Sequence, residues 1–193
     1  MFPQNHQSNT FYNFRFKQSI WPICLPEIAS NEIDEWKGSG LTLAAYGENT
    51  KNDVEDDEIL TAQTFFGQTY KLCNEAYDVG RLEAEHEKIQ TSLPRLFNDT
   101  TIFCASVPNS AAGTCPGDSG GTLLKSEFID NIGDVRSVLV GVVHGSIKEC
   151  DGSRFPSIFS RMDNYEILSW VVEEAFGLDE VDKIKMKKEN RYS

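Results

Sequence analysis

The sequence lacks several features that would place it in a special class of protein. No run of apolar residues approaches the roughly eighteen that a membrane-crossing helix needs. The first residues hold neither a basic cluster nor an apolar stretch, so no signal peptide is expected in this chain. No internal repeat or low-complexity segment occurs. These absences favour one ordinary globular domain, and 193 residues suffice to bury a sizeable core.

Basic residues are also scarce. The chain has 18 Lys and Arg against 30 Asp and Glu, a net charge of −12. This balance argues against binding to nucleic acid or to anionic membranes, whose phosphates would repel the chain. The one basic cluster, Lys183–Lys188, is expected to be a solvated tail. Two acidic stretches, Asn52–Glu58 and Glu83–Glu87, lack the spacing of a calcium loop and are expected to be solvated surface.

The cysteine pattern gives no sign of a metal or cofactor site. No Cys-x-x-Cys pair occurs and the three histidines are scattered, so neither zinc nor any other cofactor is expected. A framework of disulfides in a secreted protein is favoured instead, with weak support from the sequon at Asn98. An odd count leaves one thiol, whose partner is expected on another chain. The cysteines are Cys24, Cys73, Cys104, Cys115 and Cys150.

Short apolar segments between turn residues predict an all-β domain. In the first of them Leu41, Leu43 and Ala45 alternate with more polar neighbours, as in a half-buried strand. Six such strands are typical of a closed antiparallel barrel or a sandwich. The predicted strands are Leu41–Tyr46, Ile59–Phe66, Thr101–Ala105, Gly121–Lys125, Val135–His144 and Phe155–Arg161.

Two segments predict helices. Tyr70–Tyr77 is short and mixed in character. The stronger segment runs from near Asp163 to Phe176, and its apolar residues fall on one face. Asp163 followed by Glu166 resembles a capping box, and Gly177 is expected to end the helix. This helix is expected to pack on the barrel.

One stretch, Cys115–Gly121, indicates chemistry. It reads Cys-Pro-Gly-Asp-Ser-Gly-Gly, and a serine flanked by glycines can act as a nucleophile because glycine lets backbone N–H groups approach a substrate closely. The motif also fits the nucleophile elbow of α/β-hydrolases. The elbow requires a helix after the serine, whereas a strand is predicted from Gly121. A glycine-rich turn without function is the third interpretation, which the surrounding landmarks disfavour.

Together with its surroundings this motif resembles the trypsin/chymotrypsin-like serine proteases, the S1 peptidases, over roughly Phe14 to Trp170. The resemblance implies the second, six-stranded Greek-key barrel of such a protease with its C-terminal helix. It divides the chain into residues 1–23, an inter-barrel linker, residues 24–177, the barrel and helix, and residues 178–193, a charged tail. The landmarks, in order, are Ile20–Pro26, Leu43–Gly47, Cys73, Ile102–Ala105, Gly117–Gly121, Gly141–Ser146, Pro156–Arg161 and Trp170.

The resemblance also implies residue roles. Ser119 matches the nucleophile, and the N–H groups of Gly117 and Ser119 match the oxyanion hole. Asp118 matches the carboxylate that pairs with a new N-terminal amine after activation cleavage.

Two family disulfides are implied, and one is missing. Cys73 matches a partner of Cys104, and Cys115 matches a partner of Cys150, which leaves Cys24 unpaired. A third disulfide of the family is absent at both of its ends, Leu41 and Lys125.

The resemblance further implies a substrate pocket for a medium-sized, uncharged side chain. Gly113 matches the floor of this pocket and carries no carboxylate. Thr114, His144 and Gly145 match other parts of the wall. Ser157 replaces a glycine and is expected to narrow the pocket, and Glu149 is close enough in sequence to reach it.

The histidine and aspartate of the family's triad lie in Ala-Ala-His-Cys and Asp-Ile-Ala-Leu-Leu, and neither string occurs in this sequence. His6 and His86 are expected on the surface, and His144 is expected in the cleft wall. The chain is therefore identified as a member of the serine endopeptidases that lacks a general base, with protein or peptide substrates and an extracellular location.

A first barrel or a light chain joined through Cys24 is the expected partner, and the aromatic segment Phe11–Trp21 is expected to expose an apolar patch. Without an amine partner for Asp118, the loop Gly113–Ser119 is expected to relax. The alternatives are a non-catalytic homologue that binds or regulates proteins, and an incomplete gene product.

Overall fold

A computed structural model describes residues 23–32, 34–48, 60–86, 100–129, 134–146, 150–152, 154–176 and 185–186. Several of the features discussed above lie outside these ranges: His6, the segment Phe11–Trp21, the acidic stretch Asn52–Glu58, the sequon residue Asn98, Glu149, Gly177, and the basic cluster Lys183–Lys188 apart from Lys185 and Met186. None of the described helices is long and apolar enough to cross a membrane.

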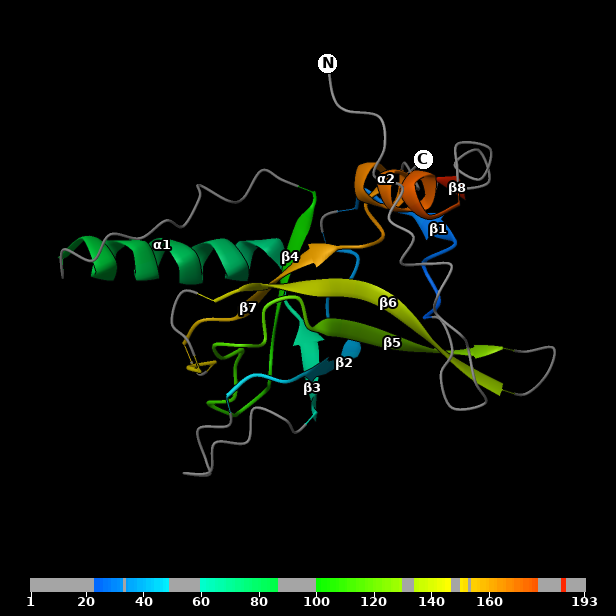
Figure 1. The fold of residues 1–193 in the computed structure, drawn as a ribbon. Helices are drawn as coiled ribbons and strands as arrows, with labels where there is room; N and C mark the ends of the chain where they lie inside the picture. Colours follow the sequence, from blue (N-terminus) through cyan, green and yellow to red (C-terminus); the bar gives the residue numbers. More distant parts are fainter. Residues whose placement is uncertain are drawn as a thin grey trace, which may run out of the picture.

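Six strands form a closed barrel in the order β2-β3-β4-β7-β6-β5, and every pair is antiparallel (Figure 1). Each overlaps a predicted segment, so the sequence prediction of a six-stranded antiparallel barrel is confirmed. The sandwich alternative is wrong, because β2 pairs with both β3 and β5 and closes the sheet. The strands are β2 (Gly40–Ala45), β3 (Thr61–Gly67), β4 (Ile102–Ser106), β5 (Thr122–Ile129), β6 (Asp134–Gly145) and β7 (Ser157–Arg161).

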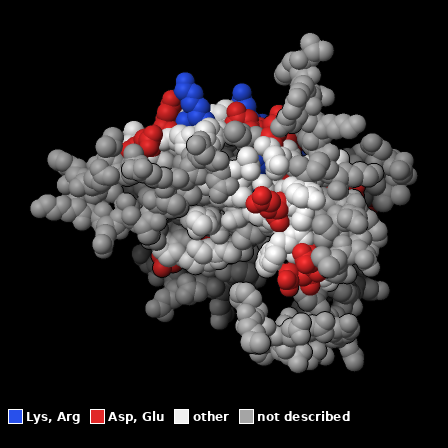
Figure 2. All heavy atoms as spheres, turned by 90° about the horizontal axis from the view of Figure 1, so that it is seen from above, with Lys and Arg blue, Asp and Glu red and all other residues white. Residues whose placement is uncertain are grey.

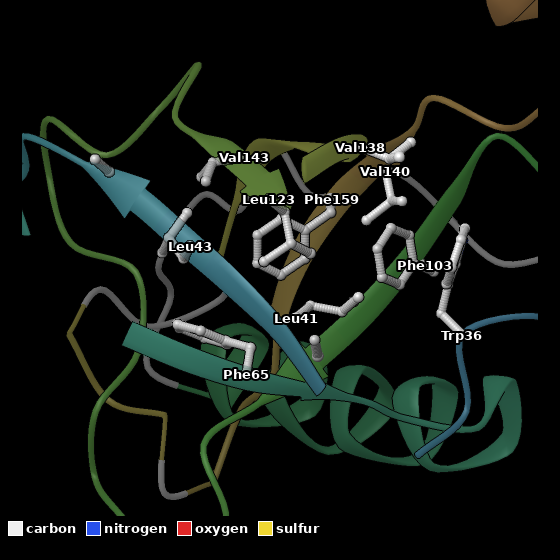
Figure 3. Packing of buried hydrophobic residues seen from close by; sticks show 12 residues of the cluster. Trp36, Leu41, Leu43, Phe65, Phe103, Leu123, Val138, Val140, Val143 and Phe159 are labelled. Carbon is white, nitrogen blue, oxygen red and sulfur yellow. The ribbon is translucent and has the colours of Figure 1, made fainter. Parts of the chain in front are cut away.

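The barrel closes around alternate side chains of its strands. In β2, residues Leu41, Leu43 and Ala45 are buried while the residues between them are not. Aromatic rings fill the centre: Phe159 lies 5.9 Å from Phe65 and 5.6 Å from Phe103, ring centroid to centroid (Figure 3). Burial of each such ring stabilises the fold by roughly 1.5–3 kcal/mol. The interior is therefore packed with side chains.

Two helices flank the barrel. Helix α1 (Tyr70–His86) begins where it was predicted and continues nine residues past the predicted end, through Glu83 and His86. Helix α2 (Tyr165–Phe176) is the predicted terminal helix, but its cap differs from the prediction. The side chain of Asn164 accepts hydrogen bonds from the N–H groups of Glu166 and Ile167, at 3.0 and 3.2 Å. The capping box on Asp163 is therefore wrong, because that carboxylate has another partner.

That partner is Arg161, whose side chain is completely buried. Its guanidinium donates two hydrogen bonds to Asp163, at 3.0 and 2.7 Å, and further bonds to the carbonyl oxygens of Ser30 and Glu32. The indole of Trp36 donates to the same Asp163 carboxylate at 3.2 Å. This cluster ties β7 and the start of α2 to the segment that precedes β2.

A second, smaller sheet lies outside the barrel. Strand β1 (Ile28–Ala29) pairs in parallel with β8 (Lys185–Met186), and Figure 1 places both near α2. The sequence pattern did not predict this strand pairing within the tail, and the expected solvation of the tail stays a prediction. An extended segment can add to a free strand edge through its backbone alone, and the sequence pattern of the tail gives no sign of this.

The position of the absent third disulfide is filled by other contacts. Leu41 is fully buried in the barrel core. The ammonium of Lys125 lies over the Trp36 ring, 5.3 Å from its centroid. Strands β2 and β5 pair Thr42 with Leu124, so Leu41 and Lys125 occupy the next positions along the same ladder. In place of the disulfide, the chain thus has a buried leucine on β2 and, beside it on β5, a lysine that makes a cation–π contact.

Candidate active site

Two disulfides hold the segments around the serine motif. Cys115 is bonded to Cys150 and Cys73 to Cys104, while Cys24 is free and half-buried. These pairings are the ones that the family resemblance implies. The first disulfide joins the start of the motif to the segment 150–152, and the second fastens α1 to β4.

The carboxylate of Asp118 is buried, and each of its oxygens accepts a hydrogen bond from the backbone. One oxygen accepts a hydrogen bond from the Gly47 N–H at 2.9 Å, and the other accepts one from the Cys115 N–H at 2.8 Å. The expectation that this carboxylate lacks a partner is therefore wrong: two backbone dipoles solvate it. With these two hydrogen bonds the loop Gly113–Ser119 is ordered around Asp118 in this structure, and the expected relaxation is not found.

Glycine is required at two positions of this arrangement. A Cβ added to Gly47 would overlap the carboxylate of Asp118. Gly117 has φ +88°, which L side chains rarely adopt, and a Cβ there would lie 3.2 Å from the Cα of Gly47. The sequence analysis missed Gly47 as a site residue, although it noted Leu43–Gly47 as a family landmark.

Ser119 is exposed at the surface of this loop. Among the described residues, the N–H groups of Gly117 and Ser119 donate no hydrogen bond, whereas the N–H groups of Asp118, Gly120 and Gly121 all do. Two backbone donors next to an exposed hydroxyl are the elements of an oxyanion hole.

The far end of the loop is anchored to β6. The Gly120 N–H donates to the Val143 carbonyl at 3.1 Å, and the Val143 N–H donates to the Gly121 carbonyl at 2.9 Å. Strand β5 then begins at Thr122. A strand follows the serine, so the nucleophile-elbow interpretation is excluded. His144 follows Val143 in β6 and is exposed.

The residues of the predicted substrate pocket differ in how much space surrounds them. Thr114 and Ser157 are buried, and the Ser157 hydroxyl accepts hydrogen bonds from the Thr114 N–H and hydroxyl, at 3.1 and 3.0 Å. Gly145 is open, since a Cβ there would meet nothing within 4 Å. Gly113 is crowded, since its Cβ would lie 2.8 Å from the Gly152 nitrogen.

A hollow of about 460 Å³ lies beside Asp118. Gly47, Glu48 and Asp118 line one part of it, Leu43 and Phe65 another, and residues 110–113 a third. Among the described residues, two carboxylates and no Lys or Arg line this hollow. Its acidic and apolar lining suits an organic cation that carries an apolar group. Within the described part of the chain, no group of His, Cys, Asp or Glu side chains is arranged to hold a metal ion.

A closed six-stranded barrel with a Gly-Asp-Ser-Gly-Gly turn is the serine-bearing barrel of a protease of the trypsin type. The family model for trypsin matches residues 7–171, so the chain belongs to the trypsin family of serine proteases.

Curated relatives agree with this assignment at low identity. The chain is 26% identical to the clotting factor G beta subunit of Tachypleus tridentatus, over 84% of the chain and 47% of that protein. It is 24% identical to melanization protease 1 of Drosophila melanogaster, over 81% of the chain and 34% of that protein. It is 25% identical to a venom protease of Bombus pensylvanicus, over 78% of the chain and 51% of that protein. The chain thus spans about a third to a half of these relatives.

Proposed function

We propose that this chain is the serine-bearing half of a trypsin-like endopeptidase that cleaves peptide bonds through Ser119. The observation that carries the proposal is the pair of free N–H groups, on Gly117 and Ser119, beside an exposed hydroxyl. Attack of the serine oxygen on a peptide carbonyl places negative charge on the carbonyl oxygen. Two backbone donors directed at that oxygen would stabilise the charge, each by about 2.7–4 kcal/mol in comparable sites.

The reaction also needs a base, and none of the three histidines lies in the Ala-Ala-His-Cys context of the family's catalytic histidine. A serine hydroxyl is a weak nucleophile until a neighbouring base takes its proton. In the trypsin family this base is a histidine oriented by an aspartate, and both belong to the first barrel. The base then returns the proton to the leaving amine, and water releases the acyl group from the serine. We therefore propose that Ser119 is unreactive in the isolated chain and is activated by a first barrel, joined as part of a longer chain or through Cys24.

Asp118 and the hollow beside it support activation by an amine. In the family, the matching carboxylate pairs with an N-terminal amine. The hollow of about 460 Å³ has room for an amine and its side chain, and Glu48 adds a second negative charge. Because Asp118 already has two backbone partners, such an amine would add to an ordered loop instead of creating it.

The preferred substrate residue is proposed to be uncharged. Gly113 offers no counter-charge for a basic side chain and has no space for one. Thr114 and Ser157 direct their hydroxyl groups at each other, and Gly145 leaves its side of the pocket open. We further propose an extracellular location, in keeping with the two disulfides and with relatives named as a clotting factor and a venom protease.

A fluorophosphonate probe, which labels activated serines, tests the proposal. The isolated chain is expected to remain unlabelled. A fusion of this chain to the first barrel of the Bombus pensylvanicus venom protease is expected to be labelled, and Ser119→Ala is expected to abolish the label. Labelling of the isolated chain that depends on Ser119 would mean that His6, His86 or His144 acts as a base.

The alternative function is a non-catalytic homologue that binds or regulates other proteins. A folded fusion that stays unlabelled, with both disulfides intact, would support this alternative. The matched control joins the same first barrel to its own second barrel. This control should be labelled, which shows that the first barrel is active.

A further inference from the structure

The short parallel sheet outside the barrel has an unusual composition. Strand β1 pairs Ile28 with Lys185 and Ala29 with Met186. The two strands come from segments of opposite charge. Residues 26–36 contain four carboxylates and no Lys or Arg, whereas residues 183–188 contain four lysines and no carboxylate.

The segment that carries β1 is fixed in place by the rest of the fold. The Ser30 N–H donates to the Asp163 carbonyl at 2.7 Å, and Arg161 donates to the carbonyl oxygens of Ser30 and Glu32. Ahead of β1, the Leu139 N–H donates to the Cys24 carbonyl at 2.9 Å. The edge of β1 is therefore held rigid before a strand is added, which lowers the entropic cost of binding.

Basic groups near β1 are already paired within the barrel. A hollow of about 240 Å³ beside Ile28 is lined by Glu27, Glu35 and Glu127, with Lys125 and Arg136 as its cations. Arg136 bonds Glu27 at 2.6 Å and Glu127 at 3.0 Å, and these hydrogen bonds raise its pKa above the ordinary value.

Lys125 also pairs with Glu127, at 3.5 Å. The neighbourhood of β1 thus keeps an excess of negative charge. Figure 2 shows carboxylates spread over the described part of the upper face, with basic side chains mostly at its margin.

We propose that the edge of β1 is a strand-addition site for basic extended segments, and that its occupant is the lysine-rich C-terminal segment Lys183–Lys188. Backbone pairing supplies part of the affinity, and the acidic segment selects for lysine. The occupied edge secures the segment that follows Cys24. This inference does not depend on the proposed catalytic activity.

Hydrogen exchange in the full chain tests whether the tail occupies β1. Replacing Lys183, Lys185, Lys187 and Lys188 by Glu puts like charges on both strands. Amide exchange in β1, Ile28–Ala29, is then expected to be at least about tenfold faster than in the wild type, while the Ser30 amide, which bonds Asp163, keeps its protection. The matched control replaces the same four lysines by Arg and is expected to keep wild-type protection. Unchanged exchange in the Glu variant would overturn the proposal.

Peptide binding tests the strand geometry. A fluorescent peptide with the sequence of residues 183–188 is expected to bind the full-length Glu variant, to bind the wild type at least about tenfold more weakly because its edge is occupied, and to dissociate at ~1 M salt. Successive N–H groups of a strand point to opposite edges. Methylation of the backbone nitrogen of Lys185 or of Met186 should therefore weaken binding in one peptide and not in the other.

Equal binding by the two methylated peptides would mean that charge alone holds the tail, and it would overturn the strand-addition site. Equal binding of the unmodified peptide to the wild type and the Glu variant would show that the tail is not the occupant.

Discussion

Removing the carboxylate of Asp163 tests how much the buried cluster around Arg161 contributes to the free energy of unfolding. In Asp163→Ala the guanidinium loses two hydrogen bonds, at 3.0 and 2.7 Å, and the Trp36 indole loses its acceptor at 3.2 Å. Arg161 is 0% exposed, so water cannot take over the charge. Breaking a buried pair from one side costs about 3–5 kcal/mol. That is a large share of a typical stability of about 5–15 kcal/mol.

Thermal and urea unfolding, followed by circular dichroism with the disulfides oxidised, measure this loss. For a chain of this size, a loss of 3–5 kcal/mol lowers the Tm by roughly 6–20 °C. Glu75→Ala is the matched control, since it breaks a pair with Lys71 whose side chains are 60% and 83% exposed. This control should cost under about 0.5 kcal/mol.

A double variant separates the charge from the packing. In Arg161→Met combined with Asp163→Leu no charge is left buried, and the double variant should be more stable than Asp163→Ala alone. The buried pair would not stabilise the fold as proposed if Asp163→Ala costs less than about 1 kcal/mol, or if the double variant is as unstable as the single one.

Three further predictions concern the loop, the thiols and the missing disulfide. Gly47→Ala should displace Asp118 and lower the free energy of unfolding by about 1–3 kcal/mol, whereas Gly40→Ala at the start of β2 should be near neutral; equal effects in urea unfolding would contradict this. Thiol titration of unreduced, denatured protein should find one reactive thiol, lost in Cys24→Ser, and a count of three or five would contradict the disulfide framework. Replacing Leu41 and Lys125 by Cys should form a third disulfide with no added thiol titre; the oxidised variant should be about 2–4 kcal/mol more stable than its reduced form, and two additional free thiols would contradict the register of β2 and β5.

The strands were predictable from sequence because turn residues separate them and their apolar residues alternate. The lengths of the strands were harder to predict. Strand β5 runs to Ile129, four residues past the predicted end, because the polar residues Ser126 and Glu127 pair across to β6, as Glu127 does with Arg136. Helix α1 was predicted too short, since Gly80 is a poor helix former; in the structure Gly80 is buried inside the helix.

The site was predictable in part. The Gly-Asp-Ser-Gly-Gly motif identified Ser119 and its neighbours, because the chemistry is encoded in consecutive residues. The partner of Asp118 was not predictable from the sequence, because Gly47 lies 71 residues away and donates only a backbone N–H. The sequence shows nothing of such a bond except that the residue lacks a side chain. The cap of α2 was assigned one residue early for a similar reason: the competing partner of Asp163 is a buried arginine, and burial is a property of the fold.

The close approach of two backbone segments beneath the serine loop has an evolutionary consequence. Residues 111–114 and 150–152 are joined by hydrogen bonds from the Cys150 and Gly152 N–H groups, and they touch where Gly113 meets Gly152. In Gly113→Asp the new Cβ would lie 2.8 Å from the Gly152 nitrogen, so a carboxylate there requires one of the two backbone segments to shift. If Gly113 forms the floor of the substrate pocket, as the family resemblance implies, a change of preference toward basic substrates would need substitutions in both segments.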